Sequence, residues 1–377
     1  MNSVYLDNAA TTPMLPEVVN VMQESMLANF GNPSSTHQYG RKAKAAVETA
    51  RKNIAKHFNV PASEIIFTAG GTEADNLILQ NAVSHLGVKR IITSKLEHHA
   101  VLNTVQFLEK KHKILIDYVR VDENGAVVLD SLGEALKKSN EKTLVSLMYV
   151  NNEIGNILPI EEVVNMCKKH NAYFHSDTVQ AIGHYPIDLQ KTQIDFIAAS
   201  AHKFHGPKGV GFTYVRKGIA VQPMFFGGEQ EKGARSSTEN VHAIIGMDKA
   251  LSLAFENMKE DSIYIKGLKS YFVQKVKELI PDVEINGESF DETSYTIVNL
   301  RFPVQDKMLL FNLDLLGVAV SGGSACQSGS NKGSHVLRAF LNAEEVQKAS
   351  VRFSFSKINT ITEIDYVLNQ LKKILKI

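Results

Sequence analysis

The stretch that decides the fold is Phe196-Ile197-Ala198-Ala199-Ser200-Ala201-His202-Lys203, a short apolar run that ends in polar and ionisable side chains. Similar β-branched and apolar runs occur at 65–68, 90–93 and 144–147, and stretches with helical periodicity separate them. The helical patterns lie at 41–57, 73–86, 100–111, 130–138 and 160–170. Strands that alternate with helices in this way predict an α/β fold with a mostly parallel sheet covered by helices.

From about Glu239 onward the order of the elements changes. Two long helical stretches are expected first, and further elements follow them. We expect strands near 294–301, 317–321 and 350–355 and helices at 305–316 and 361–376. This order predicts a smaller α+β domain. We therefore assign a large domain to 15–255 and a small domain to 1–14 together with 256–377.

The composition is that of an ordinary globular protein, with 377 residues, 44% hydrophobic and 21% charged. The formal net charge is +1, which gives no sign of a nucleic-acid or membrane partner. Two cysteines cannot form a disulfide framework, and no apolar run approaches the roughly 18 residues of a membrane span. The N-terminus lacks the pattern of a secretory signal, so we expect a cytoplasmic protein.

Chemically active side chains follow the predicted strands. In a parallel α/β sheet, ligands bind beyond the carboxyl ends of the strands, where these residues would gather. The turn at 69–72 is followed by a helix, so its backbone N–H groups could hold a phosphate. The alternative is a plain glycine turn in which Thr72 caps the helix.

Asp177 and Lys203 each end a predicted strand. A lysine in this position can bind an aldehyde, and a carboxylate can keep a pyridine nitrogen protonated, which are the two groups that pyridoxal phosphate requires. A simple salt bridge between neighbouring strands explains the pair equally well. His98, His99, His202 and His205 could instead be metal ligands, but their spacing matches no structural zinc pattern, and we expect no metal.

Cys326 lies in a Gly/Ser-rich stretch, 320–330, which offers little packing for a thiol and favours a reactive cysteine over an incidental one. Cys167 lies on an amphipathic helical pattern and is expected to be a core residue. Arg352 interrupts an alternating strand, where it could bind a substrate carboxylate or face water at a sheet edge.

Together these motifs resemble the pyridoxal-phosphate-dependent cysteine desulfurases of the NifS/IscS type, in the class V aminotransferase family. The resemblance covers nearly the whole chain. It is carried by the segments 5–13, 31–35, 72–76, 97–98, 150–155, 202–209, 235–238, 324–326 and 351–354. It implies the aspartate-aminotransferase-like fold.

The resemblance also implies a role for each site residue. Lys203 would bind the cofactor aldehyde, Asp177 the pyridine nitrogen, and His98 would stack on the ring. The ring hydroxyl would contact Gln180 and Asn152, and Arg352 with Asn152 would bind the carboxylate of L-cysteine. The phosphate would lie on Gly71, Thr72, Ser200 and His202, with Thr238 from the neighbouring subunit of a homodimer.

The implied reaction converts L-cysteine to L-alanine and leaves the sulfur on Cys326 as a persulfide, with Lys203, Cys326 and His98 as the catalytic residues. The long stretch from Cys326 to Val336 resembles the extended loop of the NifS/IscS branch and favours delivery to a sulfur-acceptor or scaffold protein. Iron–sulfur cluster assembly and tRNA or cofactor thiolation are both possible destinations. A selenocysteine lyase, another pyridoxal-phosphate enzyme and a catalytically silent interaction protein are the alternatives.

Overall fold

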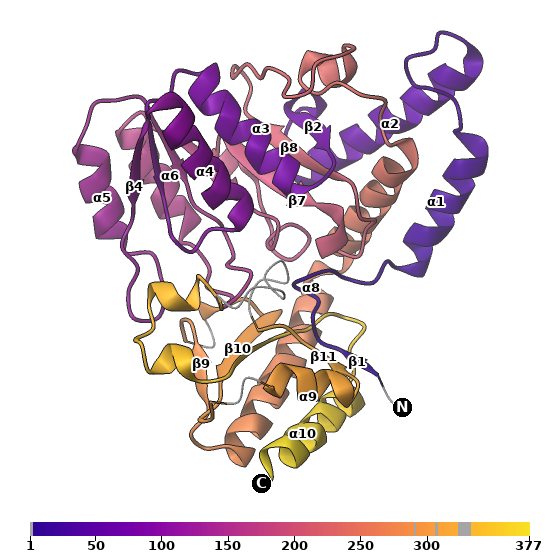
Figure 1. The fold of residues 1–377 in the computed structure, drawn as a ribbon. Helices are drawn as coiled ribbons and strands as arrows, with labels where there is room; N and C mark the ends of the chain where they lie inside the picture. The colour runs from indigo at the N-terminus through magenta and orange to yellow at the C-terminus, as the bar shows by residue number, and fades with distance from the viewer. Residues whose placement is uncertain (1–2, 290–291, 306–307, 323–332) are drawn as a thin grey trace.

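The computed structural model describes residues 3–289, 292–305, 308–322 and 333–377. Figure 1 shows a large sheet wrapped by helices and, below it, a smaller assembly of strands and helices that includes both ends of the chain. Within the described residues, none of the helices is both long enough and apolar enough to cross a lipid bilayer.

The described residues form a seven-stranded sheet in the order β2-β8-β7-β6-β5-β3-β4. Its strands are β2 (Ile65–Thr68), β3 (Arg90–Thr93), β4 (Leu115–Tyr118), β5 (Thr143–Ser146), β6 (Tyr173–Asp177), β7 (Phe196–Ser200) and β8 (Gly211–Val215). β8 runs antiparallel to both of its neighbours, and the other pairings are parallel. The predicted mostly parallel mixed sheet is therefore confirmed, and its parallel strands end at one edge.

Helices cover both faces of this sheet. The helices of this part of the chain are α1 (Pro16–Ala28), α2 (Gln38–His57), α3 (Gly71–Ser84), α4 (His99–His112), α5 (Leu129–Lys137), α6 (Ile160–Lys169) and α7 (Leu189–Thr192). Successive strand residues enter different cores, as Leu144 and Val145 show: the first packs with α3 and α4, the second with α2 and α6. Strands that are buried on both faces consist of continuous apolar runs, and these strands could therefore be predicted from the sequence.

The smaller assembly is built on a second, antiparallel sheet. In it β10 (Ile297–Arg301) pairs with both β9 (Glu284–Asn286) and β12 (Ser350–Ser354). Beside it, β1 (Val4–Tyr5) pairs in parallel with β11 (Val318–Ala319). The helices α9 (Leu309–Leu315) and α10 (Ile361–Leu375) complete the assembly, and Val4 and Leu6 pack into its core. The division of the chain into 15–255 and the remainder stays a prediction.

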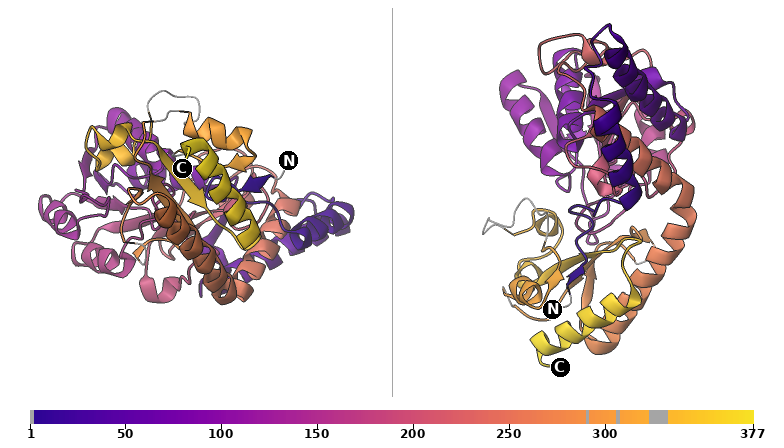
Figure 2. Two further views of the ribbon diagram at one scale, coloured as in Figure 1. Left: turned by 90° about the horizontal axis from the view of Figure 1, so that it is seen from below. Right: turned by 90° about the vertical axis from the view of Figure 1, so that its right-hand side faces the viewer.

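One continuous helix, α8 (Val241–Leu279, 39 residues), runs past both cores (Figure 2). The expectation of two helical stretches is wrong. The segment contains no proline, and each half has its own apolar contacts: Met247 packs in the core of the large sheet and Phe272 in the core of the small one. Tertiary packing on both halves keeps the helix intact despite the glycines within it.

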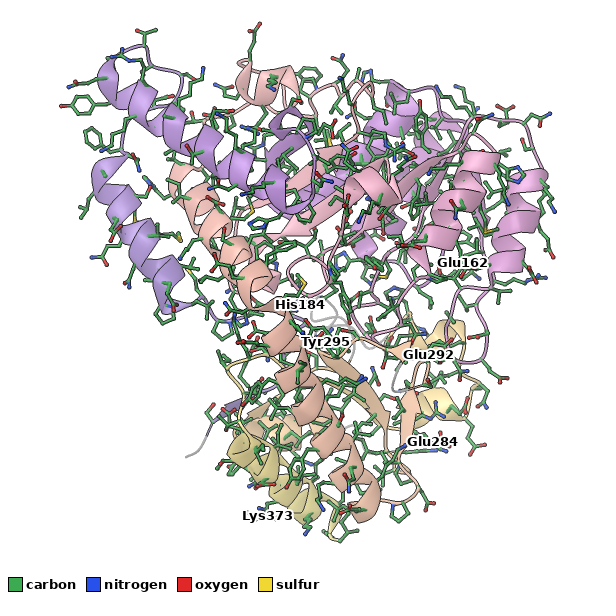
Figure 3. The ribbon with its side chains drawn as sticks, turned by 180° about the vertical axis from the view of Figure 1, so that it is seen from behind. Glu162, His184, Glu284, Glu292, Tyr295 and Lys373 are labelled. Atoms are coloured by element: carbon green, nitrogen blue, oxygen red, sulfur yellow. The ribbon has the colours of Figure 1, made fainter. Side chains whose placement is uncertain are left out.

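Short 3₁₀ helices connect several elements. They are η1 (Ala62–Glu64), η2 (Ala201–Lys203), η3 (Gln230–Gly233), η6 (Leu337–Ala339) and η7 (Glu345–Gln347). Where the two assemblies meet, the hydroxyl of Tyr295 donates to the carbonyl oxygen of His184 at 3.0 Å (Figure 3). His184 Nε2 in turn lies 3.3 Å from the carbonyl oxygen of Lys203. This contact fixes the backbone that carries the predicted lysine.

Candidate active site

A pocket of about 200 Å³ lies at the carboxyl ends of the parallel strands. Its lining residues are Ala9, Ala10, Gly71, Thr72, Asp75, His98, Met148, Asn152, Asp177, Val179, Gln180, Ser200, His202, Lys203 and Arg352. Every residue predicted to contact cofactor or substrate is among them except Thr238. The structure thus gathers side chains that are far apart in the sequence at one position.

Lys203 reaches the pocket from η2, directly after β7. Its Nζ donates to the carbonyl oxygens of Ala9 and Ala10, at 2.7 and 2.9 Å. These acceptors belong to the N-terminal segment, which crosses the pocket and also accepts a hydrogen bond from Gln180 Nε2 at the oxygen of Ala9. The amine is held at a defined place by hydrogen bonds that an aldehyde ligand could replace.

Asp177 ends β6, and its side chain is buried. The backbone N–H of Val179 donates to its Oδ1 at 2.9 Å. Burial raises the pKa of Asp177 to about 6, while the Val179 N–H group and the charge of Lys203 act in the opposite direction. The group is therefore mostly an anion at neutral pH, the form that a protonated ring nitrogen needs.

His98 is the N-cap of α4, where its Nδ1 accepts the backbone N–H of Ala100 at 3.1 Å. Burial, followed by the charge of Lys203, lowers the pKa of His98 to about 4. The ring is neutral and is fixed by the cap. A neutral, oriented imidazole in the pocket wall is suited to lying against an aromatic ring.

The N-terminus of α3 faces the pocket at Gly71 and Thr72. Interpreting Thr72 as the helix cap is wrong, because the helix begins at Gly71 and no side chain caps it. A Cβ atom at position 71 would lie 2.6 Å from Cγ2 of Val179, so only glycine leaves this close approach open. Backbone N–H groups at a helix end without a side-chain cap suit a bound anion.

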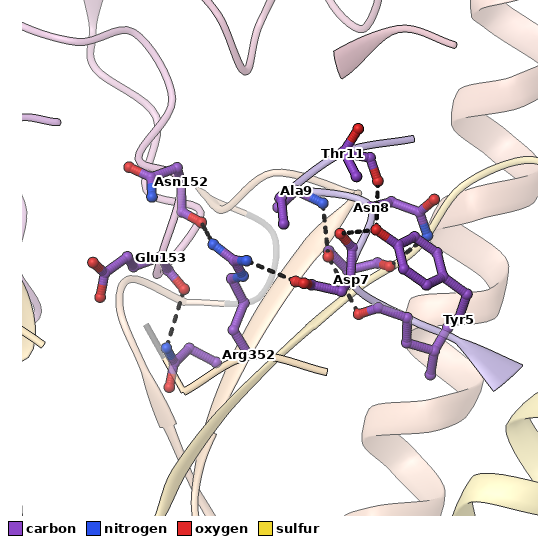
Figure 4. A network of polar contacts seen from close by, with 12 residues as sticks. Tyr5, Asp7, Asn8, Ala9, Thr11, Asn152, Glu153 and Arg352 are labelled. Carbon is purple, nitrogen blue, oxygen red and sulfur yellow. Dashed lines mark hydrogen bonds and ion pairs between the residues drawn. The ribbon is translucent and has the colours of Figure 1, made fainter. Parts of the chain in front are cut away.

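Arg352 lies on β12, and it is buried (1% exposed), so the alternative of an arginine facing water is wrong. Its Nη1 donates to the carbonyl oxygen of Asn152 and its Nη2 to Oδ1 of Asp7, both at 2.7 Å (Figure 4). Within the described residues its Nε forms no hydrogen bond. A buried donor of this kind fits the carboxylate of a substrate.

One of the predicted residues that the structure describes is not brought to this pocket. Thr238 is exposed and does not line it, and its predicted role requires a second subunit. Cys326 lies outside the described residues. Cys167 lies on α6 and is buried in the core, as expected, and burial raises the pKa of its thiol to about 12. Of the four histidines considered as metal ligands, His202 contacts Thr11 and His205 contacts Pro13.

Sequence reasoning missed Asp75 and the backbone of Ala9 and Ala10. Asp75 follows Thr72 by almost one helical turn, so the same helix end that pointed to the phosphate could have pointed to it. The carbonyl groups of Ala9 and Ala10 carry no side-chain signal. The segment 5–13 belongs to the family motifs, which marked it without indicating what it does.

Comparison with known proteins identifies the family. The model of the family described as aminotransferase class-V matches residues 4–367. The chain belongs to the class V aminotransferase family. The fold expected for this family, that of the pyridoxal-phosphate-dependent transferases, is confirmed by a solved structure of a NifS-like protein, with a TM-score of 0.92 and 36% identity over 100% of both chains.

Sequence relatives within the class V aminotransferase family agree. The chain is 44% identical to "Cysteine desulfurase IscS" of Dictyoglomus turgidum, over 99% of this chain and 94% of that protein. It is 42% identical to "Putative cysteine desulfurase IscS 1" of Bacillus subtilis, over 100% and 99%. A solved structure of SspA in complex with cysteine has a TM-score of 0.80 and 31% identity, over 95% and 100%. The resemblance to the NifS/IscS-type enzymes is confirmed.

Proposed function

We propose that this chain is a pyridoxal-phosphate-dependent cysteine desulfurase that converts L-cysteine to L-alanine and transfers the sulfur to Cys326. The observation that carries the proposal is that a lysine amine, Lys203, and a buried guanidinium, Arg352, line the same pocket. One group suits a carbonyl and the other a carboxylate. Together they select an α-amino acid bound to an aldehyde cofactor.

The residues of the pocket fit pyridoxal phosphate. The uncapped end of α3 at Gly71 and Thr72 would hold the phosphate together with Ser200 and His202. Asp177 would pair with the ring nitrogen, Gln180 and Asn152 lie within the same wall for the hydroxyl, and His98 would cover the ring. When bound, this cofactor supplies an aldehyde for the amino group of cysteine and a ring that takes up negative charge from Cα.

The chain's own residues perform the remaining steps. Arg352 binds the α-carboxylate through the donor that is left over beside Asp7 and Asn152. Lys203, once its amine has been released, takes the proton from Cα and returns it at the end of the cycle. Asp177 remains an anion and balances the positive charge of the ring nitrogen. His98, being neutral, adds no charge above the ring.

Cys326 acts as the sulfur acceptor. Its thiolate attacks the sulfur of the substrate, a S–S bond forms as the Cβ–S bond breaks, and the electron pair of that bond stays on the three-carbon fragment. Protonation of the fragment gives alanine. The persulfide then passes its outer sulfur to a thiol of an acceptor or scaffold protein, either for iron–sulfur clusters or for thiolation.

Mass spectrometry of Cys326 after incubation with L-cysteine tests this proposal. We expect an added sulfur atom on the peptide that contains Cys326, and none in Cys326→Ser. The matched control is Cys167→Ser, which removes the buried thiol. Alanine release without any adduct on Cys326 would contradict the proposed acceptor. Turnover of selenocysteine but not of cysteine would identify a lyase instead.

The proposed homodimer accounts for a group of exposed apolar side chains. Leu27 is 77% exposed and Phe30 66%, both near the end of α1, and Phe226 is 91% exposed. A second copy would cover such residues and bring its Thr238 to the phosphate. Sedimentation analysis should show a dimer, and Leu27→Asp should weaken it. A wild-type chain that sediments as a monomer at micromolar concentration contradicts this assembly.

A further inference from the structure

Asp75 belongs to a row of buried polar groups beneath the candidate pocket. Its side chain is 1% exposed and lines the pocket wall, and its Oδ1 lies 3.3 Å from Nε2 of His175 on β6. Nδ1 of the same ring lies 2.9 Å from Oγ of Ser146 on β5. Within the described part of the chain, neither Asp75 Oδ1 nor His175 Nε2 forms a hydrogen bond, either with the other or with any further group. The row leads from the sheet to the pocket.

Three carboxyl groups share this buried region: Asp75, Glu97 and Asp177. The charges of Asp177 and Glu97 both act on Asp75, and the facing cation is Lys203. Arg352 is already paired with Asp7. Since a buried charge without a partner is strongly unfavourable, three anions cannot persist beside one cation.

Hydrogen-bond donors decide which carboxyl group keeps the charge. Asp177 accepts the backbone N–H of Val179, and Glu97 accepts that of Met148 at 2.9 Å. The contact made by Asp75 is instead with an imidazole. Burial lowers the pKa of His175 to about 3, so this ring is neutral, and burial raises the pKa of Asp75 well above its usual range. Asp75 is the carboxyl group that is least stabilised as an anion.

We propose that Asp75 is a positioning residue that remains a neutral carboxylic acid beside the buried His175, so that the negative charge of the pocket stays on Asp177. If the hydroxyl of Ser146 donates to Nδ1 of His175, Nε2 carries the ring proton and lies 3.3 Å from Oδ1 of Asp75. The carboxyl proton of Asp75 would then lie on its other oxygen, on the side of the pocket. The inference rests on the proposed function only in assigning Asp177 to the ring nitrogen of the cofactor.

The pH dependence of folding distinguishes a neutral from an ionised Asp75. When the pKa of a carboxyl group is raised in the folded state, the protein loses stability as the pH rises above 3.8, the ordinary pKa of an aspartate. Asp75→Asn is always neutral and lacks this loss. Urea unfolding of the full-length chain measures this effect between pH 5 and 8. The ratio of the folding equilibrium constant of D75N to that of the wild type should rise by up to about tenfold per pH unit.

The matched control is Asp130→Asn, at an exposed aspartate in the first turn of α5, which should follow the wild type across this range. If Asp75 were instead ionised and paired with a protonated His175, D75N would lose stability at neutral pH. That result overturns the proposal.

Infrared spectroscopy gives a measurement that does not depend on a folded D75N. Wild-type chain labelled with ¹³C at the aspartate carboxyl groups should show the C=O stretch of a carboxylic acid at pH 8, and His175→Gln should shift this band. Absence of the band also overturns the proposal. Neither experiment measures turnover, so a failure here leaves the proposed desulfurase activity standing, and a failure of that activity leaves these results valid.

Discussion

Arg352 Nη2 lies 2.7 Å from Asp7 Oδ1, and this ion pair joins β12 to the N-terminal segment at the edge of the pocket. The guanidinium is buried, whereas the carboxylate of Asp7 is 16% exposed. The pair orients the arginine before any substrate arrives. The same N-terminal segment accepts the hydrogen bonds of Lys203, so one short stretch of chain aligns both groups that would hold the substrate.

Replacing Asp7 should therefore destabilise the protein. In Asp7→Asn the charge of Arg352 remains buried without its anion, and we expect the free energy of unfolding to fall by about 1–3 kcal/mol. Denaturation in urea measures the change, with exposed Asp130→Asn as the control. Equal stability of the two variants would show that Asp7 does not hold the arginine.

Gly71 offers a test of the phosphate site. In Gly71→Ala the new Cβ would lie 2.6 Å from Cγ2 of Val179, so either the helix end or the turn that follows β6 must shift. We expect the affinity for pyridoxal phosphate to fall about tenfold, which corresponds to about 1.4 kcal/mol. The double variant with Val179→Ala removes the clashing methyl group and should recover most of the affinity. Absorbance titration measures both, and a double variant no better than G71A argues against a steric cause.

Glu231 forms a buried ion pair that secures the loop containing η3. Its carboxylate accepts two hydrogen bonds from Arg51, at 2.6 and 2.7 Å, and one from the backbone N–H of Phe67. Glu231→Gln leaves the buried charge of Arg51 with the more exposed Glu48, at 3.2 Å, as its carboxylate partner, and should lower the free energy of unfolding by about 3 kcal/mol.

The exposed pair Arg120–Glu134, at 3.2 Å, provides the comparison for Glu231. Glu134→Gln should change the free energy of unfolding by less than about 1 kcal/mol, because solvent screens this pair. If both substitutions had similar effects in urea, burial would not be the cause of the difference.

Asp177 should make cofactor loading depend on pH. Its pKa of about 6 means that the carboxylate is ionised above this pH and takes up a proton below it. Affinity of the free protein for pyridoxal phosphate should therefore be maintained above pH 6 and fall as the pH drops through 6. In Asp177→Asn, binding should be weak and should not show this step. Wild-type affinity that is unchanged from pH 7 to pH 5 would contradict this assignment.

Much of the pocket was predictable because parallel strands place their last residues side by side. Asp177, Ser200 and Lys203 follow buried runs that the sequence shows clearly, and the sheet itself brings them together. Asp75 was missed because it lies on a helix and not at a strand end, and only its offset of almost one turn from Thr72 connects it to the pocket. The carbonyl oxygens of Ala9 and Ala10 escaped because backbone acceptors are the same in every residue.

The long helix shows another limit. Gly246 and Gly267 weaken the helical pattern within 241–279, and local propensity alone favours an interruption. The contacts that hold the helix together come from residues distant in sequence, such as those around Met247 in one core and Phe272 in the other. Long-range packing of this kind cannot be inferred from a single segment.

The continuity of α8 has a consequence for how the molecule melts. The single helix α8 contributes side chains to both cores. Neither core can therefore unfold without disrupting a helix that the other core needs. The two halves therefore form a single cooperative unit, and scanning calorimetry should record one endotherm. Two separate peaks would mean that α8 unfolds in its middle, so that the two cores unfold independently.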